Sequence, residues 1–158
     1  MLTRGFSIVN TLDKSQNLPM LEISVFFVKR LQMKDDLEYE PLTPETLPGR
    51  LKNLESVTSL IGNKSEEWKV TEVGDGNLNL VFVVEGKQAS LIVKQALPYV
   101  RLVGDSWPLP LSRSFFEHET LCRQAIRDPG SVPQIYYFNK KQAIIVMEML
   151  PPHVILRK

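Results

Sequence analysis

The sequence predicts an α+β fold, in which an N-terminal helical segment precedes a five-stranded antiparallel sheet with one main helix. Three short apolar runs come before a long amphipathic segment, and two more follow it, which indicates three strands, a helix and two strands. Upstream of these, apolar residues recur at helical spacing, at Leu47, Leu51, Leu54, Val57 and Leu60.

The composition is that of a globular protein. Of 158 residues, 43% are hydrophobic and 23% charged, and the net charge of +1 comes from intermixed acidic and basic residues. This pattern argues against a nucleic-acid partner, which would favour a basic face. The single cysteine, Cys122, excludes an internal disulfide and favours a reduced, cytoplasmic setting. No apolar run reaches the roughly 18 residues that span a bilayer, so no membrane partner is expected.

Four regions are expected along the chain. Residues 1–36 show no steady hydrophobic period and are expected to be a disordered extension, and residues 37–66 form the helical segment. Its helix is predicted to begin with Thr43 as N-cap and Pro44 at the first helical position, and to end at Gly62-Asn63. Pro48 and Gly49 weaken the start of this helix. Residues 67–150 form the strand-rich domain, and residues 151–158 leave it.

The strands are expected at residues 68–73, 80–85, 89–94, 134–138 and 143–147. Short hairpin turns join the second strand to the third and the fourth to the fifth. A loop rich in proline and glycine, residues 96–111, leads to the main helix. That helix is predicted to be capped by Ser112 and to end near Arg127, before Asp128-Pro129-Gly130.

A glycine-rich loop joins the first two strands, with the sequence Gly74-Asp75-Gly76-Asn77-Leu78-Asn79. Glycines let the backbone approach an anion, and free N–H groups can point at phosphate oxygens. A Rossmann site is excluded, because a strand follows the loop and Asn79 stands at the third glycine position. The kinase pattern has strands on both sides and a valine at the position of Val81, where it can pack on an adenine ring. A glycine-rich hairpin turn is the alternative.

Lys94 ends the apolar run of the third strand, as the ATP-binding lysine of kinases ends its strand. A lysine flanked by buried apolar residues needs a partner for its charge. Glu117 is the preferred partner, because it lies one helical turn before Leu121, and Glu119 is the competing candidate. The alternative is a lysine at a strand end that reaches solvent.

The last strand runs into Glu148-Met149-Leu150-Pro151-Pro152. Because prolines have no N–H, backbone donors to adenine must come at or before Leu150. The carbonyl of Glu148 and the N–H of Leu150 are the expected pair. An ordinary loop end is the alternative.

Together these stretches resemble the family of 5-methylthioribose kinases, a branch of the aminoglycoside-phosphotransferase-like, protein-kinase-like fold. The resemblance rests on residues Val73–Phe82, Ile92–Leu109 and Val146–Lys158, and the tryptophan-containing loop in the second stretch is its most specific part. It implies a kinase N-lobe over residues 67–150, with residues 151–158 as the exit from the hinge and the start of a truncated C-lobe.

The resemblance implies ATP with Mg²⁺ as cofactor, and transfer of the γ-phosphate to the C1 hydroxyl of 5-methylthioribose in methionine salvage. The implied ATP-binding residues are Gly74, Gly76, Asn77, Leu78, Asn79, Val81, Lys94, Glu117, Glu148, Met149 and Leu150. The residues implied for an active-site loop that folds over the site are Gly104, Asp105, Ser106, Trp107 and Pro108.

Kinases of this kind place their catalytic base and metal-binding aspartate in the second lobe. We therefore expect no catalytic residue and no metal ligand in this sequence, and no turnover by this chain alone. Asp75 and Asp105 lie in loops and do not replace the catalytic base and the metal-binding aspartate of the second lobe. His118 and His153 are expected to be surface or packing residues. Expected partners are ATP and, in the full-length enzyme, methylthioribose, and a homodimer is left open. The alternatives are a non-catalytic interaction module and the N-lobe of a choline, homoserine or aminoglycoside kinase, against which the tryptophan loop argues.

Overall fold

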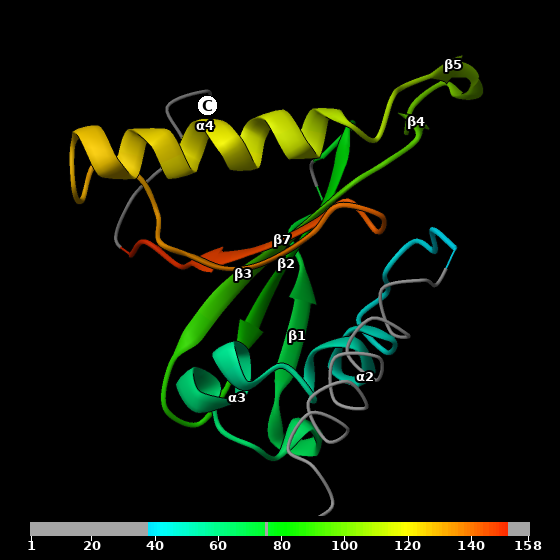
Figure 1. Cartoon of the computed structure of the whole chain (residues 1–158). Coiled ribbons are helices and arrows are strands. Elements are labelled where there is room, and N and C mark those ends of the chain that lie inside the picture. Colours follow the sequence, from blue (N-terminus) through cyan, green and yellow to red (C-terminus); the bar gives the residue numbers. More distant parts are fainter. Residues whose placement is uncertain (1–37, 75, 152–158) are drawn as a thin grey trace, which may run out of the picture. The chain divides into compact units, whose positions relative to one another are not determined.

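The computed structural model describes residues 38–74 and 76–151 (Figure 1). The extension expected at residues 1–36 and the C-lobe start expected from residue 152 lie outside the described residues. The elements in chain order are α2 (Leu47–Leu51), α3 (Glu55–Ile61), a 3-10 turn (Ser65–Glu67), β1 (Lys69–Glu72), β2 (Asn79–Glu85), β3 (Ser90–Ala96), β4 (Tyr99–Val100), β5 (Gly104–Pro108), α4 (Arg113–Arg127), β6 (Ile135–Asn139) and β7 (Ile144–Glu148).

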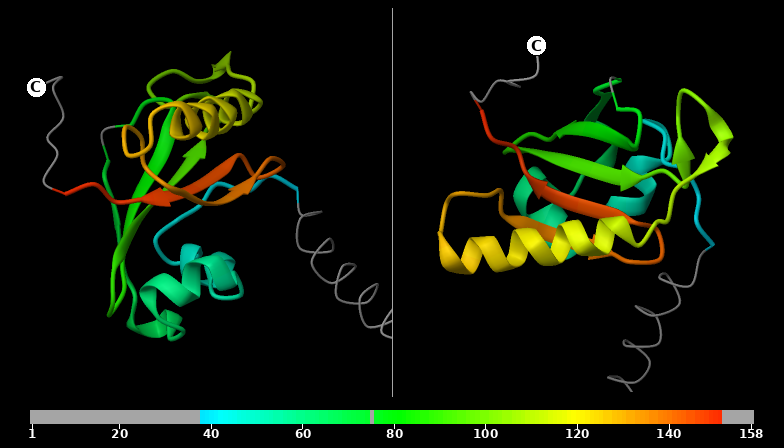
Figure 2. Two further views of the ribbon diagram at one scale, coloured as in Figure 1. Left: turned by 60° about the vertical axis from the view of Figure 1, so that its left-hand side comes forward. Right: turned by 90° about the horizontal axis from the view of Figure 1, so that it is seen from above.

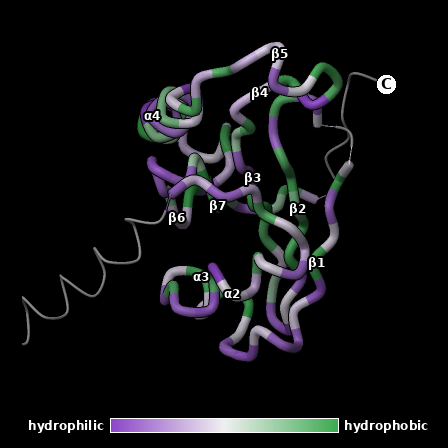
Figure 3. Tube along the Cα trace, turned by 90° about the vertical axis from the view of Figure 1, so that its right-hand side faces the viewer, coloured by the Kyte–Doolittle hydropathy of each residue, from purple (hydrophilic) through white to green (hydrophobic). Residues whose placement is uncertain are grey.

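Five strands form one antiparallel sheet in the order β1-β2-β3-β7-β6, and β4 pairs with β5 in a separate hairpin. The expected fold class is therefore confirmed. Helix α4 lies over one face of the five-stranded sheet, and α2 and α3 lie over the other (Figure 2). In Figure 3, helix α4 carries both hydrophobic and hydrophilic residues, as expected for a helix of which only one side packs on a sheet.

The hydrophobic core lies between the sheet and the two short helices. Phe82, Val93 and Val146 are opposite one another on three neighbouring strands and are fully buried. They share a core cluster with Leu47 of α2 and Val57 of α3. The alternation of buried and half-buried residues along β2 and β3 follows the two-residue repeat of a strand, which places these side chains on one face.

Two buried glutamines hold the chain segment that precedes α2. The Gln95 amide accepts a hydrogen bond from the N–H of Leu42 (2.7 Å) and donates to the carbonyls of Glu40 (2.9 Å) and Gln142 (3.0 Å). The Gln142 amide in turn accepts from the N–H of Glu40 (3.2 Å) and donates to the carbonyl of Glu38 (2.8 Å). The two side chains thus bind the backbone of residues 38–42 much as a neighbouring strand would.

The N-terminal helical segment differs from its prediction, because it forms two short helices. The cap expected at Thr43 is present, because the Thr43 hydroxyl accepts a hydrogen bond from the N–H of Thr46, the Thr46 hydroxyl accepts one from the N–H of Thr43, and the Thr43 carbonyl accepts one from the N–H of Leu47 (3.0 Å). The regular helix α2 nevertheless begins only at Leu47, with Thr46 at the N-cap position. A helix that began at Pro44 would place Pro48 in its interior, where a missing N–H and steric clash break a helix; in α2, Pro48 lies in the tolerated first turn. The expected end at Gly62, the C-cap of α3, is confirmed.

The segment between β3 and α4 also differs from a plain loop, because it contains the β4–β5 hairpin. Ser112 occupies the expected N-cap position of α4, but its side chain makes no capping hydrogen bond. Its backbone has helical φ and ψ angles (−58° and −16°), whereas a capping serine has extended backbone that turns its hydroxyl toward the first turn. No helix within residues 38–74 and 76–151 is long and apolar enough to cross a membrane.

Candidate nucleotide site

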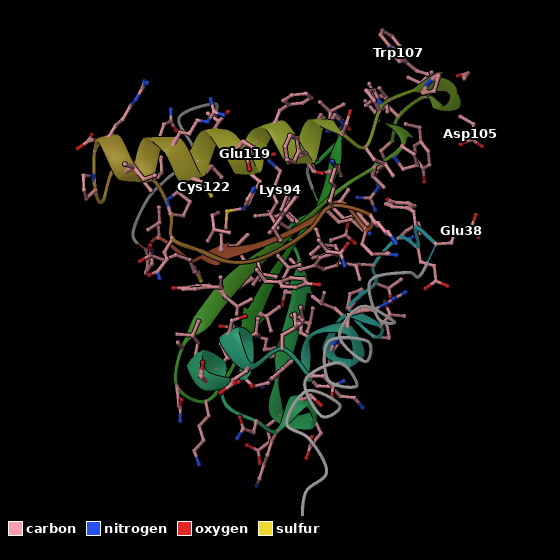
Figure 4. All side chains as sticks on the ribbon, viewed as in Figure 1. Glu38, Lys94, Asp105, Trp107, Glu119 and Cys122 are labelled. Carbon is pink, nitrogen blue, oxygen red and sulfur yellow. The ribbon has the colours of Figure 1, made fainter. Side chains whose placement is uncertain are left out.

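Lys94 and Glu117 form an ion pair between the sheet and α4, with 2.6 Å between Nζ and Oε1. Their side chains are 25% and 35% exposed, so the pair is partly shielded from water. Figure 4 shows Lys94 between the sheet and the helix. Glu119, the competing candidate, instead lies 3.3 Å from Nδ1 of His118. The expectation that Glu117 balances the charge of Lys94 is therefore confirmed.

The strand register explains why Lys94 faces α4. Lys94 is directly opposite Val81 on β2 and Ile145 on β7, and residues opposite one another in an antiparallel sheet share a face. That face alternates with the core face of Phe82 and Val93. The half-buried Val81 therefore presents an apolar surface beside the lysine.

The glycine-rich loop is held by its carbonyl groups. The carbonyl of Asn77 accepts a hydrogen bond from the N–H of Arg101 (2.8 Å), and the carbonyl of Leu78 accepts one from the N–H of Leu97 (3.0 Å). Gly74 has a positive φ of 73°, and a Cβ on Gly76 would lie 2.3 Å from the carbonyl oxygen of Asn79. Both positions therefore require glycine, the first for its backbone angle and the second for space.

Arg113, the first residue of α4, was not predicted as part of the site. Its guanidinium donates hydrogen bonds to the carbonyls of Leu78 and Leu97, the latter at 2.8 Å, and to Oδ1 of Asn79 at 3.1 Å. Burial lowers the pKa of Arg113, while the nearby carboxylate of Glu117 opposes that shift. The available sequence signal was the position of Arg113 four residues before Glu117, on the same side of a helix.

The end of β7 is tied to the residue before β6. The N–H of Glu148 donates to the carbonyl of Gln134 (2.8 Å), and the Glu148 carboxylate accepts from the N–H of Gln134 (3.1 Å). Neither bond uses the Glu148 carbonyl, which the adenine hypothesis requires. Met149 is half-buried and Leu150 is exposed at the exit from the sheet.

The tryptophan loop stands apart from these groups. Gly104, Asp105, Ser106, Trp107 and Pro108 are the residues of β5, and the Trp107 side chain is exposed. Figure 4 shows Asp105 and Trp107 on the hairpin, well separated from Lys94. The structure thus places Lys94 and Glu117 beside each other and Arg113 against the glycine loop, and it keeps β5 away from Lys94.

No group of three acidic, histidine or cysteine side chains in residues 38–74 and 76–151 is arranged to hold a metal ion. The His118 ring stacks on Phe138, with 4.2 Å between ring centroids, and its Nε2 lies 3.5 Å from Sγ of Cys122. His118 is thus a packing residue, as expected. His153 and Asp75 lie outside the described residues.

The antiparallel sheet, the long helix α4 and the Lys94–Glu117 pair are those of the N-lobe of a protein-kinase-like fold. The chain is 51% identical over 121 residues to methylthioribose kinase of Escherichia coli O45:K1, which is 76% of this chain and 29% of that protein. It is 40% identical over 121 residues to methylthioribose kinase 2 of Oryza sativa subsp. japonica (76% and 28%), and 41% identical over 119 residues to methylthioribose kinase of Exiguobacterium sibiricum (75% and 29%).

No family model matches the chain. The chain is homologous to methylthioribose kinases, which confirms the resemblance found in the sequence, and it spans less than a third of the length of these relatives.

Proposed function

We propose that the described residues form the ATP-binding lobe of an ATP-dependent S-methyl-5-thioribose kinase. This enzyme would transfer the γ-phosphate of ATP to the C1 hydroxyl of 5-methylthioribose in methionine salvage. The observation that carries the proposal is the Lys94–Glu117 pair, which lies beside Val81 on the face of the sheet toward α4. The homology to methylthioribose kinases supports the choice of substrate.

The chemistry of each group at the site suits one role in nucleotide binding. The Lys94 ammonium carries three donors, of which Glu117 takes one, so the others can bind phosphate oxygens. The glycine loop turns carbonyls of Asn77 and Leu78 toward Arg101 and Leu97, which suits a loop whose N–H groups bind phosphate. Val81 would pack on the adenine ring.

The exit of β7 is proposed to bind the adenine edge through the Glu148 carbonyl and the Leu150 N–H, with Met149 between them. The residues of β5 are proposed to cover the bound nucleotide and sugar, which requires the hairpin to move from the position it has here. Mg²⁺ would enter with ATP and neutralise phosphate charge. The described residues do not form a protein site that fits this ion.

We also propose that the chain by itself does not phosphorylate methylthioribose. Phosphoryl transfer needs carboxylates that hold metal and a group that orients the hydroxyl, and the described residues contain no such cluster. Lys94 and the glycine loop can bind and orient ATP, but they supply no base for the sugar hydroxyl.

A chimera tests the kinase function. Residues of this chain would replace the aligned part of the Escherichia coli methylthioribose kinase, to which they are 51% identical. We expect the chimera to phosphorylate methylthioribose with ATP, and the same chimera with Lys94→Met to lose nearly all turnover. A folded chimera that binds no ATP would contradict the proposal and favour a non-catalytic interaction module. Turnover of methylthioribose by the 158-residue chain alone would contradict the proposed inactivity.

A further inference from the structure

The guanidinium of Arg113 joins three parts of the site that are distant in sequence. It binds the carbonyl of Leu78 and the amide oxygen of Asn79 at the end of the glycine loop, and the carbonyl of Leu97 just after β3. We propose that Arg113 is a positioning residue that couples the glycine loop to the Lys94–Glu117 pair and thereby sets the affinity for MgATP. The inference rests on the proposed nucleotide-binding function.

The chemistry of the guanidinium suits this position. Arginine presents five N–H donors in a rigid planar fork, whereas lysine presents one compact charge. Asn79 and Ala96 are opposite each other where β2 and β3 meet the loop and the tryptophan hairpin. Arg113 therefore fixes the start of α4 to the open end of the β2–β3 hairpin, through Asn79 at the start of β2 and Leu97 just after β3.

The second half of the coupling runs along the helix. Glu117 lies one turn after Arg113, and a helix turn is rigid enough that placing one residue places the other. Besides the packing of His118 on Phe138, two polar contacts thus hold helix α4 to the sheet, one by Arg113 at the strand ends and one by Glu117 at Lys94. Loss of the first contact frees the start of the helix, so that Glu117 no longer holds Lys94 in one orientation.

The test uses the whole 158-residue chain and three variants, Arg113→Ala, Arg113→Lys and the control Arg123→Ala, which removes an exposed arginine from the same helix. MgATP affinity is measured by calorimetry, and amide hydrogen exchange is measured without nucleotide. For Arg113→Ala we expect at least about a tenfold weaker affinity, as for loss of charge-assisted hydrogen bonds. We also expect faster exchange at Asn77–Asn79 and in the first turn of α4, with neither change in Arg123→Ala.

Arg113→Lys separates the effect of the planar guanidinium from the effect of its positive charge. It also provides a second test of the inference if Arg113→Ala does not fold. A lysine keeps the positive charge but cannot reach three acceptors, so we expect it to resemble Arg113→Ala. Affinity and exchange like those of the wild type would show that charge alone suffices and would overturn the inference. Unchanged exchange in both variants would overturn it too.

A double-mutant cycle with Glu117→Gln tests whether Arg113 acts through the ion pair. We expect Arg113→Ala to weaken MgATP binding much less in the Glu117→Gln background than in the wild type. Additive effects would overturn the coupling. A wild type that binds no ATP would overturn the proposed function. The exchange measurement needs no ATP, so it would still show whether Arg113 holds the glycine loop and the start of α4 in place.

Discussion

Nζ of Lys94 and Oε1 of Glu117 lie 2.6 Å apart, although the two residues are 23 positions apart in sequence. An ion pair this exposed contributes little to folding, about 0–1 kcal/mol in comparable cases. We therefore propose that the pair serves mainly to hold the ammonium in one place beside Val81, where the proposed nucleotide would bind. Changes at the pair should affect ligand affinity more than stability.

Lys94→Met is the direct test of that reasoning. The substitution keeps most of the aliphatic stem but removes the charge, so phosphate loses a charge-assisted partner worth about 1.5–3 kcal/mol. We expect MgATP affinity of the chain to fall at least about tenfold, with little change in thermal stability. The matched control is Lys87→Met, which changes an exposed lysine in the β2–β3 turn. Equal affinities in the two variants would remove Lys94 from the site.

The buried glutamine on β3 yields a prediction about stability. Gln95→Leu has nearly the same size, but it leaves the N–H of Leu42 and the carbonyls of Glu40 and Gln142 without their partner. Each unsatisfied buried group costs about 1–3 kcal/mol, so we expect a loss of at least that size in the free energy of unfolding. Urea denaturation measures it.

The control for that experiment is Gln124→Leu, on the exposed side of α4. It makes the same chemical change at a site without buried partners, and we expect it to alter the free energy of unfolding by less than about 0.5 kcal/mol. Comparable losses in both variants would mean that the Gln95 network does not hold residues 38–42 in place. Faster amide exchange at Leu42 in Gln95→Leu alone would agree with the prediction.

Gly76→Ala should disturb the glycine loop without unfolding the domain. The new Cβ would lie 2.3 Å from the carbonyl oxygen of Asn79, so the backbone of the loop must shift. We expect weaker MgATP binding and a nearly unchanged melting temperature. Gly49→Ala is the control, because nothing lies within 4 Å of its Cβ and it is in helix α2, where alanine is favoured by about 0.5–1 kcal/mol. Unchanged affinity in Gly76→Ala would argue against a role of this loop in binding phosphate.

Sequence reasoning succeeded where one local pattern determines the structure. The strands follow from runs of β-branched residues with a two-residue repeat, and α4 from its amphipathic period and the Asp128-Pro129-Gly130 stop. The Lys94–Glu117 pair was predictable because a half-buried charge on a strand requires a partner, and the following helix carries few candidates on the correct side.

It failed where the deciding contacts come from distant residues. Gln95 follows Lys94 as one more polar residue, and nothing nearby shows that its amide meets the backbone of Glu40 and Leu42, more than 50 residues away. Arg113 meets Leu78 and Leu97 only after the sheet and helix are assembled. The late start of α2 agrees with the local signal that Pro48 and Gly49 weaken a helix begun at Pro44, since Pro48 cannot lie in a helix interior.

Tyr39 should make the stability of the protein depend on pH at high pH. Its hydroxyl donates a hydrogen bond to the carbonyl of Ala96 (2.9 Å). Burial, and secondarily the neighbouring phenol of Tyr99, raise its pKa from 10.0 to about 12. The folded protein therefore favours the neutral phenol, whose contribution to stability is fully present below the unfolded pKa of 10.0 and is lost as the pH rises through about 12.

The comparison of wild type with Tyr39→Phe isolates this effect, because all other tyrosines and lysines titrate in both proteins. We expect the wild type to have the larger free energy of unfolding at neutral pH, since its phenol is hydrogen-bonded. The difference between the two proteins should stay constant up to about pH 9 and then shrink between pH 10 and about 12. Urea denaturation at a series of pH values measures it. A difference that stays constant through this range would mean that Tyr39 has the same pKa in the folded protein as in the unfolded chain. Burial and the hydrogen bond to the Ala96 carbonyl would then not favour the neutral phenol.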